Sequence, residues 1–316
     1  MTIRRALILA PGVIILFLVQ SYLWVPTYEE QTRGNPDRLN EYITASIGDA
    51  SILNPILSAD SASSDIESMV FEGLIDRDEE LRFRARMATS WEIHEEAFFY
   101  VNKDASIPGV GRAGAQDVAG LLRRARAGDL PTNPEVEASM ENIREISVVP
   151  AREFLVTRYE NEKEGKGPAE VKLRVSAPAR IRLVLYGVDQ DLFENLSHIL
   201  GQDYFSGFSG QDYLAVDDER WEERRAGYAQ EILPATEHNP IVVFHLRPGV
   251  RFHDGHIFDA HDVKFTFDAI MNPKNLSPRI ADYEPVKCVE VVDPMTVRIV
   301  YKRLYSPALG TWTMGI

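Results

Sequence analysis

The segment 240–301 carries the clearest alternation of apolar and polar positions in the chain. Residues 242–246 alternate as in a half-buried strand, and Pro248-Gly249 fits the centre of a type II turn, which predicts a hairpin. Asp259 and Asp262 then fit a capping pair at the start of a helix. The predicted elements are strands at 242–246 and 250–252, a helix at 260–271, and a second hairpin with strands at 289–291 and 297–301.

Residues 41–101 show a weaker pattern of the same kind. Ser64 and Glu67 have the spacing of a capping box, and Ile66, Met69 and Val70 fall on one face of the helix that would follow. The predicted elements are a strand at 41–47, a helix at 65–72 and a strand at 97–101.

Residues 103–235 differ in character, because two helical stripes enclose three strand-like runs. The stripes end at Gly128 and Gly201, and glycine is common just past the end of a helix. The predicted strands are 153–159, 171–175 and 181–185, and the predicted helices cover 118–125 and 192–199. An α-β-β-β-α unit of this size can bury its own small core. We therefore predict an inserted α+β subdomain at 103–235.

The N-terminal segment is uncharged from residue 7 to residue 25, directly after Arg4 and Arg5. At a rise of about 1.5 Å per residue, a helix of this length approaches the thickness of a bilayer core. The segment does not end in a small-x-small cleavage site, and the arginines favour a cytoplasmic N-terminus. We predict an uncleaved transmembrane anchor at 1–25 and a polar tether at 26–41. A cleaved signal with an atypical site is the alternative.

Composition and charge exclude several classes of protein. The chain has 316 residues, of which 45% are hydrophobic and 26% are charged, as in an ordinary folded protein. Its 34 basic and 48 acidic residues give a net charge of −14 without a basic block, so we expect no nucleic-acid partner. The single cysteine, Cys288, excludes an intramolecular disulfide and a multi-cysteine zinc site.

Two motifs suggest chemistry that the rest of the sequence does not favour. Residues 109–114 have the form G-x-G-x-x-G before a predicted helix, but no parallel βαβ unit follows, so we interpret them as a glycine-rich loop rather than a cofactor site.

His245, His253, His256 and His261 lie with three aspartates within 18 positions, a density that could ligate zinc. Without an H-E-x-x-H helix, we expect surface histidines and no metal site. An extracytoplasmic metalloenzyme is the least favoured function.

Three blocks of sequence, in order, resemble the family 5 extracellular solute-binding proteins, the oligopeptide-, dipeptide- and nickel-binding components of ABC importers. The strongest block is FHLRPGVRFHDG at 244–255 with AHDVKFTF at 260–267, and the resemblance covers 42–101 and 240–309. The residues that carry the family pattern, which we expect to be structural, are Asn54, Pro55, Gly73, Trp91, Arg247, Gly249, Phe252, Asp254, Gly255, Ala260, Asp262 and Val263.

The resemblance implies an α/β fold. Residues 42–102 and 236–316 would form an incomplete lobe of the type II periplasmic-binding-protein kind, and the chain would end before the second lobe. In the family, the loop after the Asn-Pro element lines the ligand cleft, and by position this loop falls on Ala59, Asp60 and Ser61. Asp60 would pair with the α-ammonium of a peptide. The alternative is an ordinary loop aspartate.

The resemblance also implies a function without catalysis or cofactors. The protein would lie in the bacterial periplasm, anchored to the inner membrane by residues 7–25, and would capture peptides or similar small solutes for the permease subunits of an ABC importer. The alternative is a membrane-anchored sensor or assembly protein that keeps the fold and binds another protein through residues 103–235.

Overall fold

The computed structural model describes residues 2–24, 47–161 and 168–316, and the chain divides into two units, residues 1–49 and residues 50–316. The first unit contains helix α1 (Thr2–Trp24). Among the described residues, no helix combines the length and the apolar character needed to cross a membrane, so the predicted anchor is not supported. The predicted tether at 26–41 lies outside the described residues, and so does the predicted strand at 41–47 except for Ile47.

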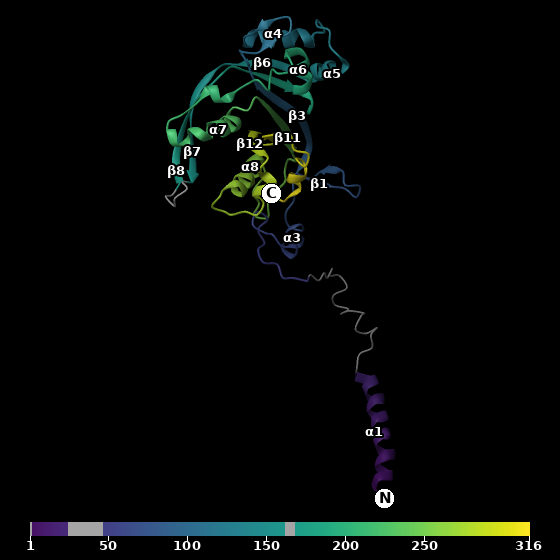
Figure 1. The fold of residues 1–316 in the computed structure, drawn as a ribbon. Coiled ribbons are helices and arrows are strands. Elements are labelled where there is room, and N and C mark those ends of the chain that lie inside the picture. The colour runs from purple at the N-terminus through teal and green to yellow at the C-terminus, as the bar shows by residue number, and fades with distance from the viewer. Residues whose placement is uncertain (1, 25–46, 162–167) are drawn as a thin grey trace. The chain divides into compact units, whose positions relative to one another are not determined.

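An antiparallel six-stranded sheet forms the centre of the second unit, with the strand order β12-β13-β11-β3-β9-β6 (Figure 1). The two central strands β3 and β11 pair over almost the whole length of β11, from Thr236 opposite Phe99 to Leu246 opposite Ala88. The strands are β3 (Ala88–Tyr100), β6 (Ile143–Val149), β9 (Arg180–Leu185), β11 (Thr236–Leu246), β12 (Val286–Asp293) and β13 (Thr296–Tyr301).

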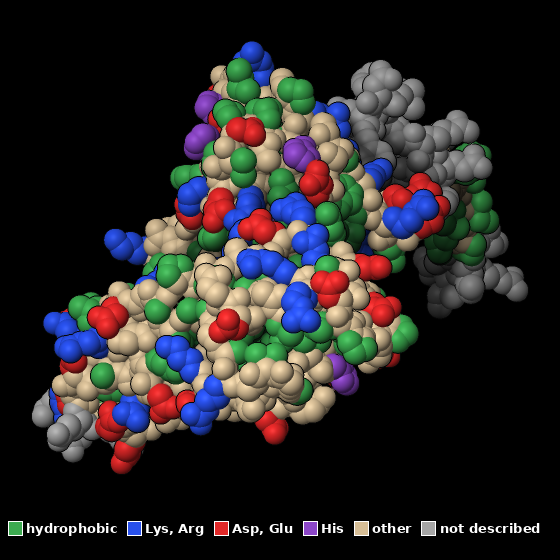
Figure 2. Space-filling view, turned by 90° about the horizontal axis from the view of Figure 1, so that it is seen from above, with side chains coloured by type: hydrophobic (Ala, Val, Ile, Leu, Met, Phe, Trp, Pro, Cys, Tyr) green, Lys and Arg blue, Asp and Glu red, His purple; other side chains and the backbone are tan. Residues whose placement is uncertain are grey.

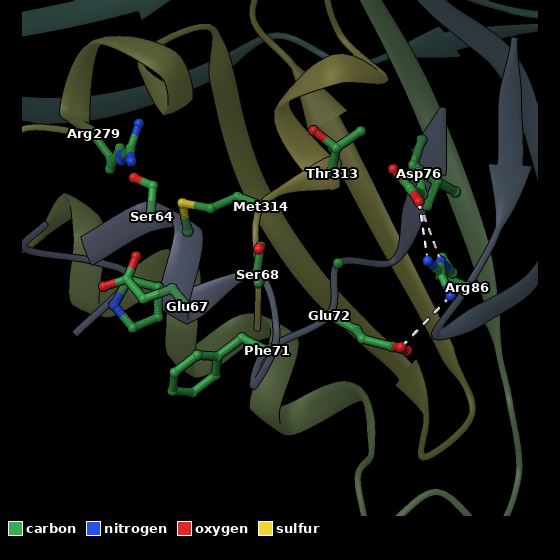
Figure 3. A pocket seen from close by; sticks show the side chains of 14 residues that line it. Ser64, Glu67, Ser68, Phe71, Glu72, Asp76, Arg86, Arg279, Thr313 and Met314 are labelled. Atoms are coloured by element: carbon green, nitrogen blue, oxygen red, sulfur yellow. Dashed lines mark hydrogen bonds and ion pairs between the residues drawn. The ribbon is translucent and has the colours of Figure 1, made fainter. Parts of the chain in front are cut away.

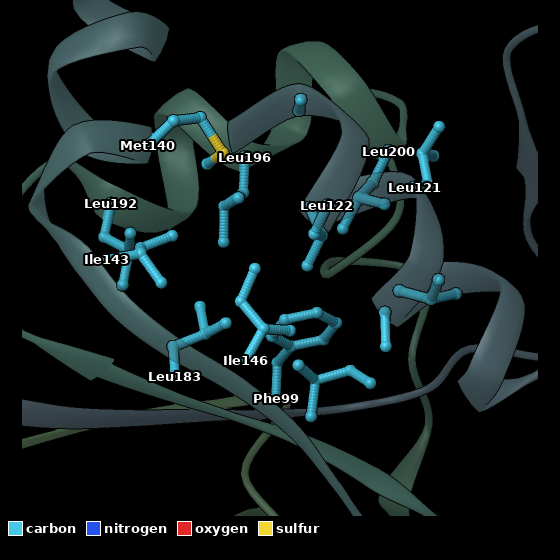
Figure 4. Packing of buried hydrophobic residues seen from close by; sticks show 14 of the residues in the cluster. Phe99, Leu121, Leu122, Met140, Ile143, Ile146, Leu183, Leu192, Leu196 and Leu200 are labelled. Carbon is cyan, nitrogen blue, oxygen red and sulfur yellow. The ribbon is translucent and has the colours of Figure 1, made fainter. Parts of the chain in front are cut away.

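Helices cover this sheet in two places. Helices α4, α5 and α6 pack on β3, β9 and β6, where Phe99, Leu183 and Ile146 meet Leu122 and Leu196 in a fully apolar core (Figure 4). Burial of each such side chain away from water contributes about 1.5–3 kcal/mol to the stability of the folded state. Helix α8 packs against β12 and β13 in a second core. The helices are α4 (Ala115–Arg126), α5 (Pro134–Asn142), α6 (Leu192–Leu200) and α8 (Ala260–Met271).

A second, three-stranded sheet has the order β10-β8-β7 and shares a third core with helix α7. Its members are β7 (Arg152–Asn161), β8 (Pro168–Ala177), β10 (Leu214–Val216) and α7 (Arg225–Ile232). The remaining elements are α3 (Ser61–Glu67), α9 (Ile280–Tyr283), the paired strands β1 (Ile75–Arg77) and β2 (Phe83–Ala85), the paired strands β4 (Ser106–Ile107) and β5 (Gly111–Arg112), and 3-10 turns at Gly210–Tyr213, Glu219–Arg224 and Gly310–Thr313.

Residues 103–235 share the central sheet with the rest of the second unit. Strand β9 pairs directly with β3, with Leu183 opposite Ala97, and β6 pairs with β9. The core under α4 and α6 also contains Phe99 and Val101, which lie outside 103–235. The predicted boundaries at 103 and 235 therefore do not separate two sheets or two cores.

The predicted hairpin between 242–246 and 250–252 is wrong. Both edges of β11 are already paired, one with β3 and the other with β13, so no edge is left for a return strand. The chain after Gly249, whose φ is +78°, forms a small loop closed by a bridge between Arg251 and Ile257. The helix at 260–271 and the hairpin of β12 and β13 are confirmed.

Helix α3 begins and ends earlier than the predicted helix at 65–72. Asp60 is its N-cap and accepts a hydrogen bond from the Ser63 backbone N–H at 2.8 Å, whereas Ser64 lies inside the helix. The side chains expected on one helical face are consequently exposed, with 72% of Met69 and 49% of Val70 accessible.

The glycine-rich segment 109–114 joins and follows a small hairpin. Gly109 and Gly111 have φ values of +72° and +85°, and the segment leads from β4 through β5 to Gly114, the N-cap of α4. Its glycines therefore serve a tight turn and a helix start.

Candidate functional site

A pocket of about 300 Å³ lies between helix α3, the segment that follows it, and residues 313–315 (Figure 3). Ser64, Glu67 and Ser68 project from α3 and its end, and Arg279 approaches from the turn before α9. The pocket therefore joins parts of the second unit that are more than 200 positions apart in the sequence.

Gly73 fixes one wall of this pocket. A Cβ atom at this position would lie 2.6 Å from the carbonyl carbon and oxygen of Thr313 and 2.8 Å from the carbonyl oxygen of Met314. Only a glycine allows the two backbone segments to approach this closely. The Ile316 backbone N–H donates to the Glu72 carbonyl at 3.0 Å and holds the same approach.

Glu67 places an unpartnered carboxylate oxygen at the pocket. The residue is only 7% exposed, and its Oε2 accepts a hydrogen bond from Ser58 Oγ at 2.7 Å. Its Oε1 is buried without a hydrogen-bond partner among the described residues. A buried polar atom without a partner destabilises the folded protein by about 1–3 kcal/mol, and by more when it is charged. A ligand that donates a hydrogen bond to Glu67 Oε1 would recover this free energy.

Arg279 brings an unpartnered cation to the same pocket. Its Nε is buried without a partner among the described residues, and its backbone N–H donates to Ser277 Oγ at 3.2 Å. Glu67 and Arg279 thus present opposite charges to one cavity while each lacks a full set of partners.

The other charged side chains of the pocket are already paired. Arg86 lies 3.2 Å from Asp76 and 3.7 Å from Glu72 (Figure 3). Arg84, outside the lining of the pocket, lies 2.8 Å from Asp76. The hydrogen bond from Arg84 is the main reason that the pKa of Asp76 lies below its ordinary value. These groups form a neutralised wall, so Glu67 and Arg279 are the charges available to a ligand.

The loop residues predicted to contact a ligand lie next to the pocket but are not part of its lining. Asp60 accepts hydrogen bonds from Ser51 Oγ at 2.6 Å and from Ser63, and these bonds, that of Ser51 first, lower its pKa to about 2. Ala59 and Ser61 are exposed on either side of it. A ligand contact at Asp60 stays a prediction, while its role as the cap of α3 is observed.

The residues of the family pattern hold turns and core contacts together. Arg247 Nε donates to the Arg86 carbonyl at 2.9 Å, and Trp91 packs on Phe244 with ring centroids 6.5 Å apart. Asp254 accepts from the His256 backbone N–H at 2.9 Å. Asn54 caps its own turn, Pro55 lines the pocket, Gly255 has a φ of +91°, Ala260 and Val263 are buried, Phe252 packs beside the second core, and Asp262 completes the capping box of α8.

Three of the four clustered histidines lie beside different carboxylates, with His256 at 3.8 Å from Asp262. His245 lies 3.5 Å from Glu92, and His261 lies 3.2 Å from Asp259. Within the part of the chain that the structure describes, no three His, Cys, Asp or Glu side chains come together to hold a metal ion.

On the face shown in Figure 2, basic and acidic side chains are interspersed. The central sheet carries one such arrangement as a ladder across its strands. Glu96 of β3 lies 2.8 Å from Arg182 of β9 and 3.0 Å from Arg298 of β13. These ion pairs link β3 to β9 and to β13, and the opposite charges of the side chains balance one another.

Comparison with known proteins adds a sequence relationship to this geometry. Residues 235–314 match the family described as bacterial extracellular solute-binding proteins, family 5, middle region. The predicted resemblance to family 5 is confirmed. The glutathione-binding protein GsiB of Salmonella paratyphi A is 46% identical over 61 residues, which are 19% of this chain and 12% of GsiB. GsiB of Escherichia coli is 27% identical over 116 residues, which are 37% of this chain and 21% of GsiB.

These alignments therefore span about an eighth to a fifth of the relatives' length. Among solved structures, NikZ from Campylobacter jejuni in complex with Ni(L-His) aligns with 85% of this chain and 25% of its own, at 16% identity and a TM-score of 0.35.

Proposed function

We propose that the protein captures a small solute in the bacterial periplasm as the solute-binding component of an ABC importer. The observation that carries this proposal is the family 5 match over residues 235–314, which run from the start of β11 to the wall of the pocket. The protein binds its solute without chemistry and delivers it to permease subunits. Its fold belongs to the periplasmic-binding type, with the second unit contributing one lobe.

The pocket supports a solute that carries both an ammonium group and a carboxylate. An ammonium would give Glu67 Oε1 the donor that it lacks, and a carboxylate would give the Arg279 Nε–H the acceptor that it lacks. Free peptides have both groups, and so does glutathione, the ligand named for the GsiB relatives. The substrate class is therefore a peptide or a peptide-like solute.

The proposal is tested by measuring binding of glutathione and of free dipeptides, each beside its N-acetylated form. Acetylation removes the ammonium, so we expect at least about tenfold weaker binding, which corresponds to 1.4 kcal/mol. The Glu67→Gln variant, whose side-chain oxygen can still accept from Ser58, should lose this discrimination. Glu72→Gln is the matched control, because Glu72 lines the same pocket but is 55% exposed and pairs with Arg86.

Two results would overturn the proposal. One is the absence of saturable binding by any member of the panel. The other is binding that neither acetylation nor Glu67→Gln changes. Co-purification of another protein without a small ligand would instead favour the sensor or assembly alternative.

A further inference from the structure

Strand β7 (Arg152–Asn161) has one edge that pairs with nothing among the described residues. It lies at the end of the three-stranded sheet, and all ten of its residues pair with β8 on the other side. The free edge presents a row of backbone N–H and C=O groups that another strand could join.

The edge also lacks two of the features that usually prevent such pairing, a proline and a β-bulge. Strand β7 contains no proline or glycine, and its register with β8 has no bulge. Two large apolar side chains stand on its outer face, Leu155 at 69% exposure and Tyr159 at 72% exposure. An exposed, regular edge of this length is a surface suited to a partner strand.

The charges along the edge are complementary to those of a second copy in antiparallel register. When Val156 lies opposite its own symmetry mate, Arg152 falls opposite Glu160 of the second copy, and Leu155 falls opposite Thr157. The Arg152 guanidinium has no ion pair or hydrogen bond among the described residues and lies over the Phe154 ring, 4.8 Å from its centroid. Glu160 accepts from Arg224 and from Tyr228, which holds it in place and leaves each of its oxygens able to accept again.

We propose that two copies of this chain associate through their β7 edges around a two-fold axis at Val156, so that the two three-stranded sheets become one continuous sheet. Such an interface is isologous, since each contact occurs twice. It uses no residue of the pocket at Glu67 and is independent of the proposed function.

Sedimentation velocity over a concentration series tests this dimer on the full chain. The wild type should dimerise. The double variant Leu155→Lys/Thr157→Lys brings like charges together across the axis at two exposed positions, so we expect about tenfold or more weaker association. Leu155→Glu/Thr157→Glu should do the same, and an equimolar mixture of the two variants should restore the dimer. Ala215→Lys is the matched control, because Ala215 is exposed on the opposite edge of the same sheet.

The mixing step separates loss of association from loss of folding, because misfolded variants would not rescue each other. Far-ultraviolet circular dichroism of each variant gives an independent check of folding. A wild type that stays monomeric overturns the proposal. A dimer that survives both double variants overturns it as well, since association then uses another surface.

Discussion

Gly73 is a residue at the pocket whose replacement would make two backbone segments clash. Gly73→Ala would place a Cβ atom 2.6 Å from the backbone of Thr313, where no flexible side chain can move aside. We expect the free energy of unfolding to fall by about 1–3 kcal/mol, the usual cost of overpacking. Urea unfolding of the variant and the wild type measures this difference.

Gly120→Ala is the control for that substitution. Gly120 lies inside α4, and a Cβ there would meet no atom within 4 Å. Replacing glycine by alanine within a helix should raise stability by about 0.5–1 kcal/mol. If Gly73→Ala were as stable as the wild type, the close approach of residues 73 and 313 would not exist in solution.

At the scale of single residues, the sequence indicated the right neighbourhood but misplaced the cap of α3. Ser64 and Glu67 were expected to cap the helix, but Asp60 is its N-cap and Glu67 lies buried at the pocket. A ligand contact at Asp60 stays a prediction. Spacing alone does not decide whether Asp60 or Ser64, which lie four positions apart, caps the helix. The decision comes from Ser51, which donates to Asp60 from outside the helix.

Helix α3 should become sensitive to pH through its cap. The pKa of Asp60 is about 2 in the folded protein, below the ordinary value of 3.8, because the ionised form accepts hydrogen bonds from Ser51 and Ser63. A lowered pKa means that ionised Asp60 stabilises the folded state above about pH 4, and that this contribution is lost as the pH falls through about 2.

Nuclear magnetic resonance titration of the Asp60 carboxyl carbon checks this expectation and should give a midpoint well below 3.8. Asp60→Asn keeps a capping side chain but cannot titrate, so its stability should depend less on pH between 4 and 2 than that of the wild type. Equal pH dependence of the two proteins would show that Asp60 does not hold the cap in its ionised form.

At the scale of elements, local signals predicted what local contacts determine. Asp259 and Asp262 correctly predicted the start of α8, and the alternation around residue 293 predicted the hairpin of β12 and β13. Helix α5 could also have been predicted, because Asn133 and Pro134 are a typical helix start. The hairpin after β11 could not have been excluded, since β11 pairs with a strand about 150 positions away.

At the scale of the whole molecule, residues 50–316 should unfold as one cooperative unit. Strand β9 belongs to the segment 103–235 and β13 does not, yet both lie in one sheet. Hydrogen-exchange mass spectrometry along a urea series should therefore give the same midpoint for peptides from β9 and from β13. Separate midpoints would contradict this prediction and would favour an independent subdomain at 103–235.

The sequence suggested that independent subdomain because it shows which segments are apolar but not which strands pair. Two helical stripes around three strands have the pattern of a unit with its own core. In the structure, however, β9 pairs with β3 and β6 pairs with β9. The same limit applies to the pocket, whose walls at Glu67, Gly73 and Arg279 come together only through the fold.

We propose above that a solute binds in this pocket through Glu67 and Arg279. A crystal structure of the protein grown with glutathione tests it most directly. We expect glutathione in the pocket, with its ammonium within hydrogen-bond distance of Glu67 Oε1 and a carboxylate at the Arg279 guanidinium. Glutathione bound elsewhere on the protein, or a pocket that stays empty at saturating concentration, would show that Glu67 and Arg279 do not form the binding site.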